Sequence, residues 1–295
     1  MGVCRVVVGF IVLVASSHVF ADDYEIRMSR PAKVGDAYEL VASASSSEQV
    51  TFSTQGRLMG ADKSFIAAKL ECTVTVLQVD ELDREKKVKL LVSKATMSTS
   101  KDGEQKEALP KGTQVVAQPG DGQEEYLIDG RVVPDEIAEM LGLFITFPTS
   151  QVTDDDVFGT KDRKRVGDSW AVNSIKAAND LAAEGLKVDP EDFEGSTTIE
   201  KAVVVDGIPC LTLSSKMELS KVEPPLPPEM TLEKSSMSAA YSGNFPVDTS
   251  LRRLSEKTNM TMEIVAKGEF APNAPVVTMS VSAKHTTEVK QRPLK

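Results

Sequence analysis

Apolar and polar residues alternate with a period of two along several long segments of this chain. This alternation is typical of β-strands that have one wet face. In segment 72–79, Cys72, Val74 and Val76 fall on one side. The polar residues 80–85 separate this segment from a second alternating one at 87–93. The two segments therefore predict an antiparallel hairpin.

Two more hairpins are predicted further along the chain. Segments 202–206 and 210–219 flank a Gly-Ile-Pro turn. Near the C-terminus, segments 260–264 and 277–281 alternate on either side of a turn at 271–275. Strands joined by short turns in this way favour a meandering antiparallel sheet.

Two short helices are also predicted. The sequence Val-Pro-Asp-Glu at 133–136 is a good helix start, and Ile137, Met140, Leu141 and Phe144 follow at helical spacing. The second helix covers about 175–184. The fold class is therefore mainly β (α+β), with antiparallel meander sheets in two similar halves. We expect a curled sheet around the helix near 137–147.

The first 21 residues have the pattern of a secretory signal peptide. Arg5 precedes an apolar run at 6–14, and Val-Phe-Ala at 19–21 forms a small-x-small cleavage site. The run is too short to span a bilayer, which takes about 20 residues. Cleavage after Ala21 predicts an exported mature chain, periplasmic or extracellular, with no transmembrane segment. An uncleaved anchor is the alternative interpretation.

Composition narrows the classes of partner. The 295 residues are 41% hydrophobic and 26% charged, which is ordinary for a globular protein. The formal charge is −10, and nucleic-acid binding relies on clustered Lys and Arg. We therefore predict no nucleic-acid partner.

Only two cysteines, Cys72 and Cys210, remain after the signal peptide is removed. In an oxidising compartment they could form a disulfide. Two buried, unpaired cysteines are the equal alternative. Neither lies in a Cys-x-x-Cys pair, so a redox enzyme is not indicated.

A short motif occurs twice and suggests an internal repeat. Lys-Val-Gly-Asp-Ala-Tyr at 33–38 returns as Arg-Val-Gly-Asp-Ser-Trp at 165–170, and segment 91–98 resembles 213–220. Gly and Asp favour a turn, and the aromatic residue would open a strand. The residues of this repeated turn are Gly35, Asp36, Tyr38, Gly167, Asp168 and Trp170. A chance match between common Gly-Asp turns is the alternative.

The repeat divides the mature chain into an N-terminal β-rich half at 22–150 and a C-terminal β-rich half at 151–295. We expect both halves to pack into one globular unit.

Motifs for catalysis and cofactors are weak. His285 is the one histidine outside the signal peptide, and it lies among threonines, so a solvated strand position is expected. No Gly-x-Ser-x-Gly motif accompanies it. Asp154 and Asp156 do not complete an EF-hand, so we interpret 154–156 as a solvated acidic loop. We therefore predict no catalytic residue, no metal and no cofactor.

Six methionines gather in the second half, several at strand spacing. They are Met217, Met230, Met237, Met260, Met262 and Met279. Flexible thioethers adapt to varied apolar partners, so such a face could hold a lipid or another apolar ligand. Ordinary core packing is the alternative for these side chains.

The signal peptide, the Gly-Asp-Tyr/Trp strand openings and the long meanders together resemble an uncharacterised family of secreted bacterial proteins, known as a domain of unknown function. The resemblance implies an envelope or extracellular setting and supplies no catalytic residues. We expect a non-enzymatic binding or envelope-associated protein whose partner is an apolar ligand or an envelope component. A hydrolase using dispersed carboxylates and a structural or adhesive module are the alternatives.

Overall fold

The computed structural model describes residues 23–101, 103–269 and 275–294. The predicted signal peptide at 1–21 lies outside the described residues. The described chain is mainly β and antiparallel with short helices, which confirms the predicted fold class.

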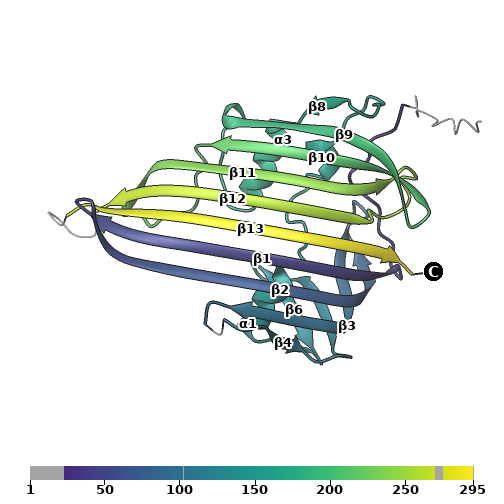
Figure 1. The fold of residues 1–295 in the computed structure, drawn as a ribbon, viewed down its shortest axis with the longest axis horizontal. Coiled ribbons are helices and arrows are strands. Elements are labelled where there is room, and N and C mark those ends of the chain that lie inside the picture. The colour runs from purple at the N-terminus through teal and green to yellow at the C-terminus, as the bar shows by residue number, and fades with distance from the viewer. Residues whose placement is uncertain (1–22, 102, 270–274, 295) are drawn as a thin grey trace, which may run out of the picture.

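One antiparallel sheet of 13 strands forms the body of the described chain (Figure 1). Its order is β7-β6-β5-β3-β2-β1-β13-β12-β11-β10-β9-β8, and β4 pairs with β3 outside this path. The first and last strands are neighbours, paired from Tyr38 opposite Pro293 to Thr54 opposite Val277. The sheet therefore continues unbroken from the N-terminal half into the C-terminal half.

The strands differ widely in length, and those at the centre of the sheet are the longest. Their bounds are β1 Ala37–Thr54, β2 Arg57–Val79, β3 Glu85–Thr99, β4 Lys106–Leu109, β5 Gln114–Pro119, β6 Glu124–Ile128, β7 Arg131–Val132, β8 Ser169–Ala171, β9 Phe193–Val205, β10 Ile208–Ser220, β11 Met230–Pro246, β12 Ser255–Gly268 and β13 Val277–Pro293.

All three predicted hairpins are present, as β2–β3, β9–β10 and β12–β13. Each is longer than its alternating segment. In β2, side chains alternate between buried and wetter positions from Ile66 to Val76, whereas Arg57–Phe65 is exposed throughout. Alternation marks only the part of a strand that has one covered face, so the sequence pattern underestimates strand length.

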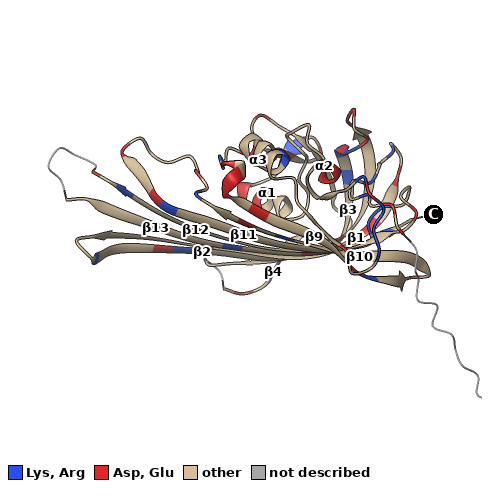
Figure 2. Ribbon diagram, turned by 90° about the horizontal axis from the view of Figure 1, so that it is seen from above, with Lys and Arg blue, Asp and Glu red and all other residues tan. Residues whose placement is uncertain are grey.

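Three α-helices lie on one face of the sheet, which we call the inner face (Figure 2). They are α1 Asp135–Gly142, α2 Asp154–Phe158 and α3 Ser174–Ala183, and a short 3-10 helix covers Pro190–Asp192. The two predicted helices correspond to α1 and α3.

The prediction of a solvated loop at 154–156 was wrong, because these acids form the first turn of α2. Thr153 caps that turn: its hydroxyl accepts the Asp156 N–H, and the Asp156 carboxylate accepts the Thr153 N–H. This is a capping box with Asp in the position usually held by Glu or Gln.

The largest core cluster lies where β1, β2, β3, β5 and β6 pack around α1. Met140 and Leu141 of the helix are fully buried there. The helix ends at Gly142, earlier than predicted, but Ile145 and Phe147 continue into the same cluster. The Tyr126 hydroxyl donates to the Ile145 carbonyl at 2.6 Å and fixes this segment against the sheet.

The helices leave one end of the sheet bare. Figure 2 shows β2, β12 and β13 running well beyond the helical layer. We call this helix-free end the wing, and define it as residues 49–65, 262–268 and 277–283. Its backbone is paired across β12, β13, β1 and β2, yet much of its side-chain surface has no protein cover.

Candidate functional site: an apolar track on the inner face

The six methionines singled out in the sequence all lie on the inner face. Strand register places them there, because Met237 is opposite Met262, Met260 is opposite His285, and Met217 is opposite Ala239. The same face continues into β1, where Ser46 is opposite His285 and Phe52 is opposite Met279. Distant parts of the sequence thus supply one surface.

Apolar side chains continue from this group along the strands into the wing. We call this surface the apolar track. It consists of Met237 of β11, Met260, Met262, Ile264 and Ala266 of β12, Met279, Val281 and Ala283 of β13, and Val50 and Phe52 of β1.

The two faces of the sheet differ sharply at the track. On β12 the inner-face residues Met260, Met262 and Ile264 alternate with Asn259, Thr261 and Glu263 on the outer face. Met260 and Met262 are half-buried, and Ile264 is buried. This is the polarity of a sheet with a covered inner face, although in the wing no helix supplies the cover (Figure 2).

The track is long enough for an extended hydrocarbon chain. On β13 the inner-face residues from Val277 to His285 are all half-buried, and these two residues are eight positions apart, which corresponds to about 27 Å at the rise of an antiparallel strand. Half the thickness of a bilayer's hydrocarbon core is about 15 Å. A hydrocarbon chain of that length therefore fits along the inner face of β13.

His285 lies at the inner end of the track. It is half-buried on β13, beside Met260, and its Nε2 lies 2.7 Å from the Thr287 hydroxyl. Burial lowers the pKa of the imidazole, so the neutral form is favoured. His285 lies on a strand beside threonines, as expected, but it is half-buried and not fully solvated, because the strand turns it towards the inner face.

A polar cleft of about 1030 Å³ opens at the other end of the inner face. Arg252 lies over the Tyr38 ring, with its guanidinium carbon 4.1 Å from the ring centroid, and forms an ion pair with Glu85. Arg253 lies 3.1 Å from Glu256 and 3.7 Å from Asp154. Both of these arginines are therefore paired with carboxylates.

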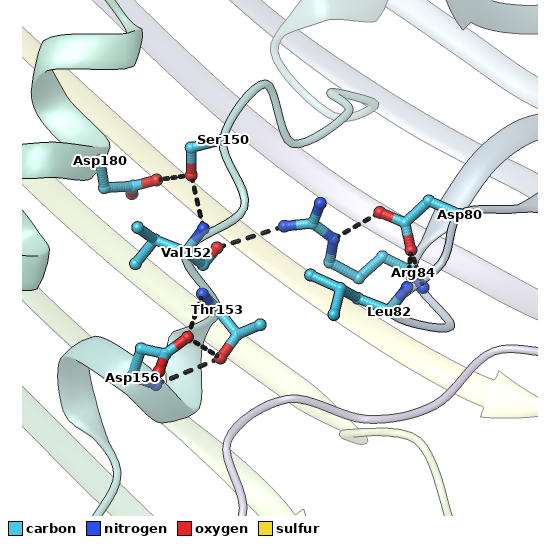
Figure 3. A network of polar contacts seen from close by, with 8 residues as sticks. All are labelled: Asp80, Leu82, Arg84, Ser150, Val152, Thr153, Asp156 and Asp180. Atoms are coloured by element: carbon cyan, nitrogen blue, oxygen red, sulfur yellow. Dashed lines mark hydrogen bonds and ion pairs between the residues drawn. The ribbon is translucent and has the colours of Figure 1, made fainter.

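Figure 3 shows how one wall of this cleft is cross-linked. Arg84, in the turn between β2 and β3, donates through Nε to Asp80 at 2.6 Å and through Nη1 to the Val152 carbonyl at 3.2 Å. Ser150 donates to Asp180 of α3 at 2.5 Å. The segment before α2 is thus tied both to the N-terminal half and to α3.

One carboxyl group in the cleft has a raised pKa. Burial raises the pKa of Asp155, against the effect of its hydrogen bonds from the N-terminal segment. Its Oδ1 accepts the Met28 N–H at 2.5 Å, and its Oδ2 lies 3.8 Å from Arg27. These contacts make Asp155 a fastening point for the segment that precedes β1.

The structure keeps the two cysteines apart. Cys72 lies on β2 and Cys210 on β10, with β1, β13, β12 and β11 between them in the sheet. Neighbouring strands are about 4.8 Å apart, so five steps separate the cysteines by roughly 24 Å, beyond the reach of a disulfide. Both thiols are free and buried, and the unpaired alternative is the arrangement present.

The two copies of the repeated turn make the same local hydrogen bonds. Asp36 accepts the Lys33 N–H, and Asp168 accepts the Arg165 N–H, each at 2.8 Å. Gly35 and Gly167 both have φ of +93°, a conformation that favours glycine. In each copy the glycine N–H donates to the neighbouring strand, at Val76 of β2 and Ile199 of β9.

The aromatic residues that follow these turns differ in depth. Tyr38 is buried in the largest core cluster, whereas Trp170 is half-buried and donates its Nε1–H to the Phe158 carbonyl at 2.8 Å. The strands they open occupy different places, since β1 is central and β8 is at the sheet edge.

The sequence matches no known family profile and no curated protein. Solved structures give distant likenesses. One is lipovitellin, described for its lipid–protein interactions, at 8% identity and a TM-score of 0.35. The likeness covers 89% of this chain and 26% of that chain, so this chain spans about a quarter of lipovitellin's length.

Two bacterial structures are more distant still. A LolA superfamily protein from Nitrosomonas europaea is 11% identical with a TM-score of 0.16, over 90% of each chain. A DUF1329 family protein from Desulfovibrio piger is 10% identical with a TM-score of 0.11, over 82% of this chain and 83% of that one. At these values the likenesses assign no function, and the site rests on its own geometry.

Within the described ranges, no helix is both long enough and apolar enough to cross a bilayer.

Proposed function

We propose that this chain is an exported protein that binds an apolar ligand with a long hydrocarbon chain along the apolar track. The observation that carries the proposal is the half-buried apolar inner face formed by Met260 and Met262 of β12 and by β13 from Val277 to Ala283, which continues beyond the helices. Ile264 and Ala266, next to it on β12, are already buried. A ligand laid along it would supply the cover that the helices supply over the rest of the inner face.

The side chains of the track suit such a ligand. Met260, Met262 and Met279 have flexible, polarisable side chains that adjust to partners of varied shape. The track is open at the wing, so a ligand can enter along its length without unfolding any element. The carboxylates nearest to the track by strand register are Glu48, opposite Ala283, and Asp62, opposite Val50, both at its β1–β2 side. At the inner end, His285 is favoured in its neutral form and places no fixed charge there.

Adhesion through the sheet edges, one of the alternatives, has little support. The outermost strands, β7 at Arg131–Val132 and β8 at Ser169–Ala171, are only two and three residues long. Very short edge strands are a common protection against pairing with another chain.

The test is a titration with a fluorescent fatty acid, using two variants that add the same charge to adjacent residues. Met262→Glu puts a carboxylate into the track, and Thr261→Glu puts one on the outer face of the same strand. Desolvating a carboxylate against a hydrocarbon chain is costly. We expect Met262→Glu to raise Kd at least tenfold, about 1.4 kcal/mol, and Thr261→Glu to leave it unchanged.

Equal binding by both variants, or no binding by the parent protein, would refute the proposal. A folded state for each variant is verified by circular dichroism before titration.

A further inference from the structure

The wing ends in a narrow hairpin tip that carries exposed apolar side chains. Leu58 is 62% exposed and Met59 is 65% exposed, and both follow the tight turn at Gln55–Gly56. Phe52, at 37% exposed, lies on the opposite strand of the same hairpin. We define the tip as residues 51–60.

A neighbouring strand adds to this surface. The Thr54 hydroxyl donates to the Val276 carbonyl at 2.9 Å, so the residue before β13 lies beside the tip. Val276 is itself 43% exposed. Four exposed apolar side chains therefore lie at this end of the sheet, with Phe52 on the inner face and Leu58, opposite Ser53, on the outer face. The hairpin of β1 and β2 that carries three of them is far from the helices (Figure 1).

The backbone conformation of the tip leaves these side chains exposed to solvent. Gln55 and Gly56 both have positive φ, as a two-residue hairpin turn requires. The register shifts between Phe52 and Ser53, which leaves Met59 as the extra residue of a bulge. A bulge re-aims side chains and ends regular alternation, so adjacent Leu58 and Met59 can both be exposed.

The one charged residue within the tip itself, Arg57, is basic, in contrast to the negative net charge of the chain. Arg57 lies in the tip and Lys63 follows it, with Asp62 between them, whereas the whole chain has a formal charge of −10. Apolar side chains flanked by Lys and Arg are typical of segments that insert into the interface of an anionic bilayer.

The small size of the tip distinguishes a bilayer from a protein partner. A stable protein–protein interface buries about 800 Å² on each side, which takes 20 to 30 residues. The tip offers one two-residue turn and a few side chains. Insertion into a bilayer needs no such matching area.

We propose that the wing tip inserts Leu58 and Met59 into the interface of a lipid bilayer. Phe52 lies both in the tip and at the end of the apolar track, so the track would open at the membrane surface. Insertion of the tip does not depend on the proposed function. Only the role of the bilayer as source or destination of the ligand rests on it.

Flotation with vesicles of phosphatidylcholine and phosphatidylglycerol at 3:1 tests the inference. The variant carries Leu58→Asp and Met59→Asp. The control carries Leu82→Asp and Val204→Asp, two positions that are 41% and 70% exposed at the other end of the sheet. Both proteins gain the same charge at exposed sites, so general repulsion from the anionic surface is matched.

We expect the tip variant to bind vesicles at least tenfold more weakly than the parent protein, and the control to bind as the parent does. A parent protein that does not float, or two variants that lose binding equally, would overturn the inference. A parent protein that binds vesicles through the tip but takes up no fatty acid supports the tip's role and refutes the proposed function alone.

A second measurement reports on insertion directly. In Met59→Trp, brominated lipids should quench the new tryptophan, whereas in Leu82→Trp they should not. Equal quenching of both tryptophans would contradict insertion through the tip.

Discussion

Replacing Arg84 with methionine tests whether the network in Figure 3 holds the two halves of the chain together. The side chain of Arg84 is 15% exposed and that of Asp80 is 21% exposed, so the pair is largely shielded from water. Methionine keeps an apolar stem and removes both the ion pair and the donor to the Val152 carbonyl.

The expected loss of stability follows from these contacts. A hydrogen bond to a charged group contributes about 1.5–3 kcal/mol, and removing one partner of a fully buried pair costs about 3–5 kcal/mol. Asp80 still accepts the backbone N–H groups of Leu82 and Arg84, which limits the cost. We therefore expect Arg84→Met to lower the free energy of unfolding by about 2 kcal/mol, which corresponds to a fall in Tm of about 5 °C.

The assay is urea unfolding followed by circular dichroism, with Arg165→Met as the control. Arg165 makes an equally short ion pair, 2.6 Å from Asp23, but is 64% exposed, so its loss should not shift the midpoint measurably. Equal midpoints for Arg84→Met and the parent protein would refute a stabilising role for the network.

The difference in the free energy of unfolding between the parent protein and Arg84→Met should also depend on pH. Burial acts to raise the pKa of Asp80, but hydrogen bonds from Arg84 and Leu82 outweigh it and hold the pKa below the ordinary value of 3.8. A lowered folded-state pKa stabilises the protein above pH 3.8. The loss of unfolding free energy in Arg84→Met should therefore be largest at neutral pH. It should become smaller as the pH falls through the folded-state pKa of Asp80.

Three further predictions concern the cysteines, the repeated turn and the packing of the halves. Burial raises the pKa of Cys72 to about 12, so Ellman's reagent should label no thiol in the native mature protein and two after unfolding in urea; labelling of fewer than two would reveal a disulfide. Gly35→Ala and Gly167→Ala should each destabilise by about 1 kcal/mol in thermal unfolding, because both positions have positive φ; loss in one copy alone would argue against equivalent turns. Calorimetry should give one cooperative transition, and two separate transitions would contradict a single packed unit.

Local patterns predicted the parts of the fold that depend on neighbouring residues. Two alternating segments predicted the β12–β13 hairpin: one contains Met260, Met262 and Ile264, and the other contains Val277 and Met279. These side chains lie on the inner face, and the residues next to them in the sequence lie on the more polar outer face. The sequence therefore alternates with a period of two.

Pairings between distant segments could not be predicted in this way. The Ser-rich second half of β1 has little alternation because both of its faces are wet in the wing. Its partner β13 lies more than 200 residues away, and a period of two does not identify the strand that pairs. The position of His285 depends on that pairing, so its inner-face burial was missed.

The cleft shows a related limit of sequence reasoning. Three of its arginines, Arg84, Arg252 and Arg253, come from turns that are far apart in the sequence and meet only in the folded protein. The helix α2 was missed for a different reason, since its capping box uses Asp156 within a run of acids that resembles an exposed loop.

Native mass spectrometry of the mature protein, recovered gently from the host that exports it, tests the central claim most directly. We predict an added mass in the range of a lipid or fatty acid that disappears on denaturation, and that Met262→Glu lacks it while Thr261→Glu keeps it. A bare mass for the parent protein, unchanged after incubation with excess oleate, would contradict ligand binding along the apolar track.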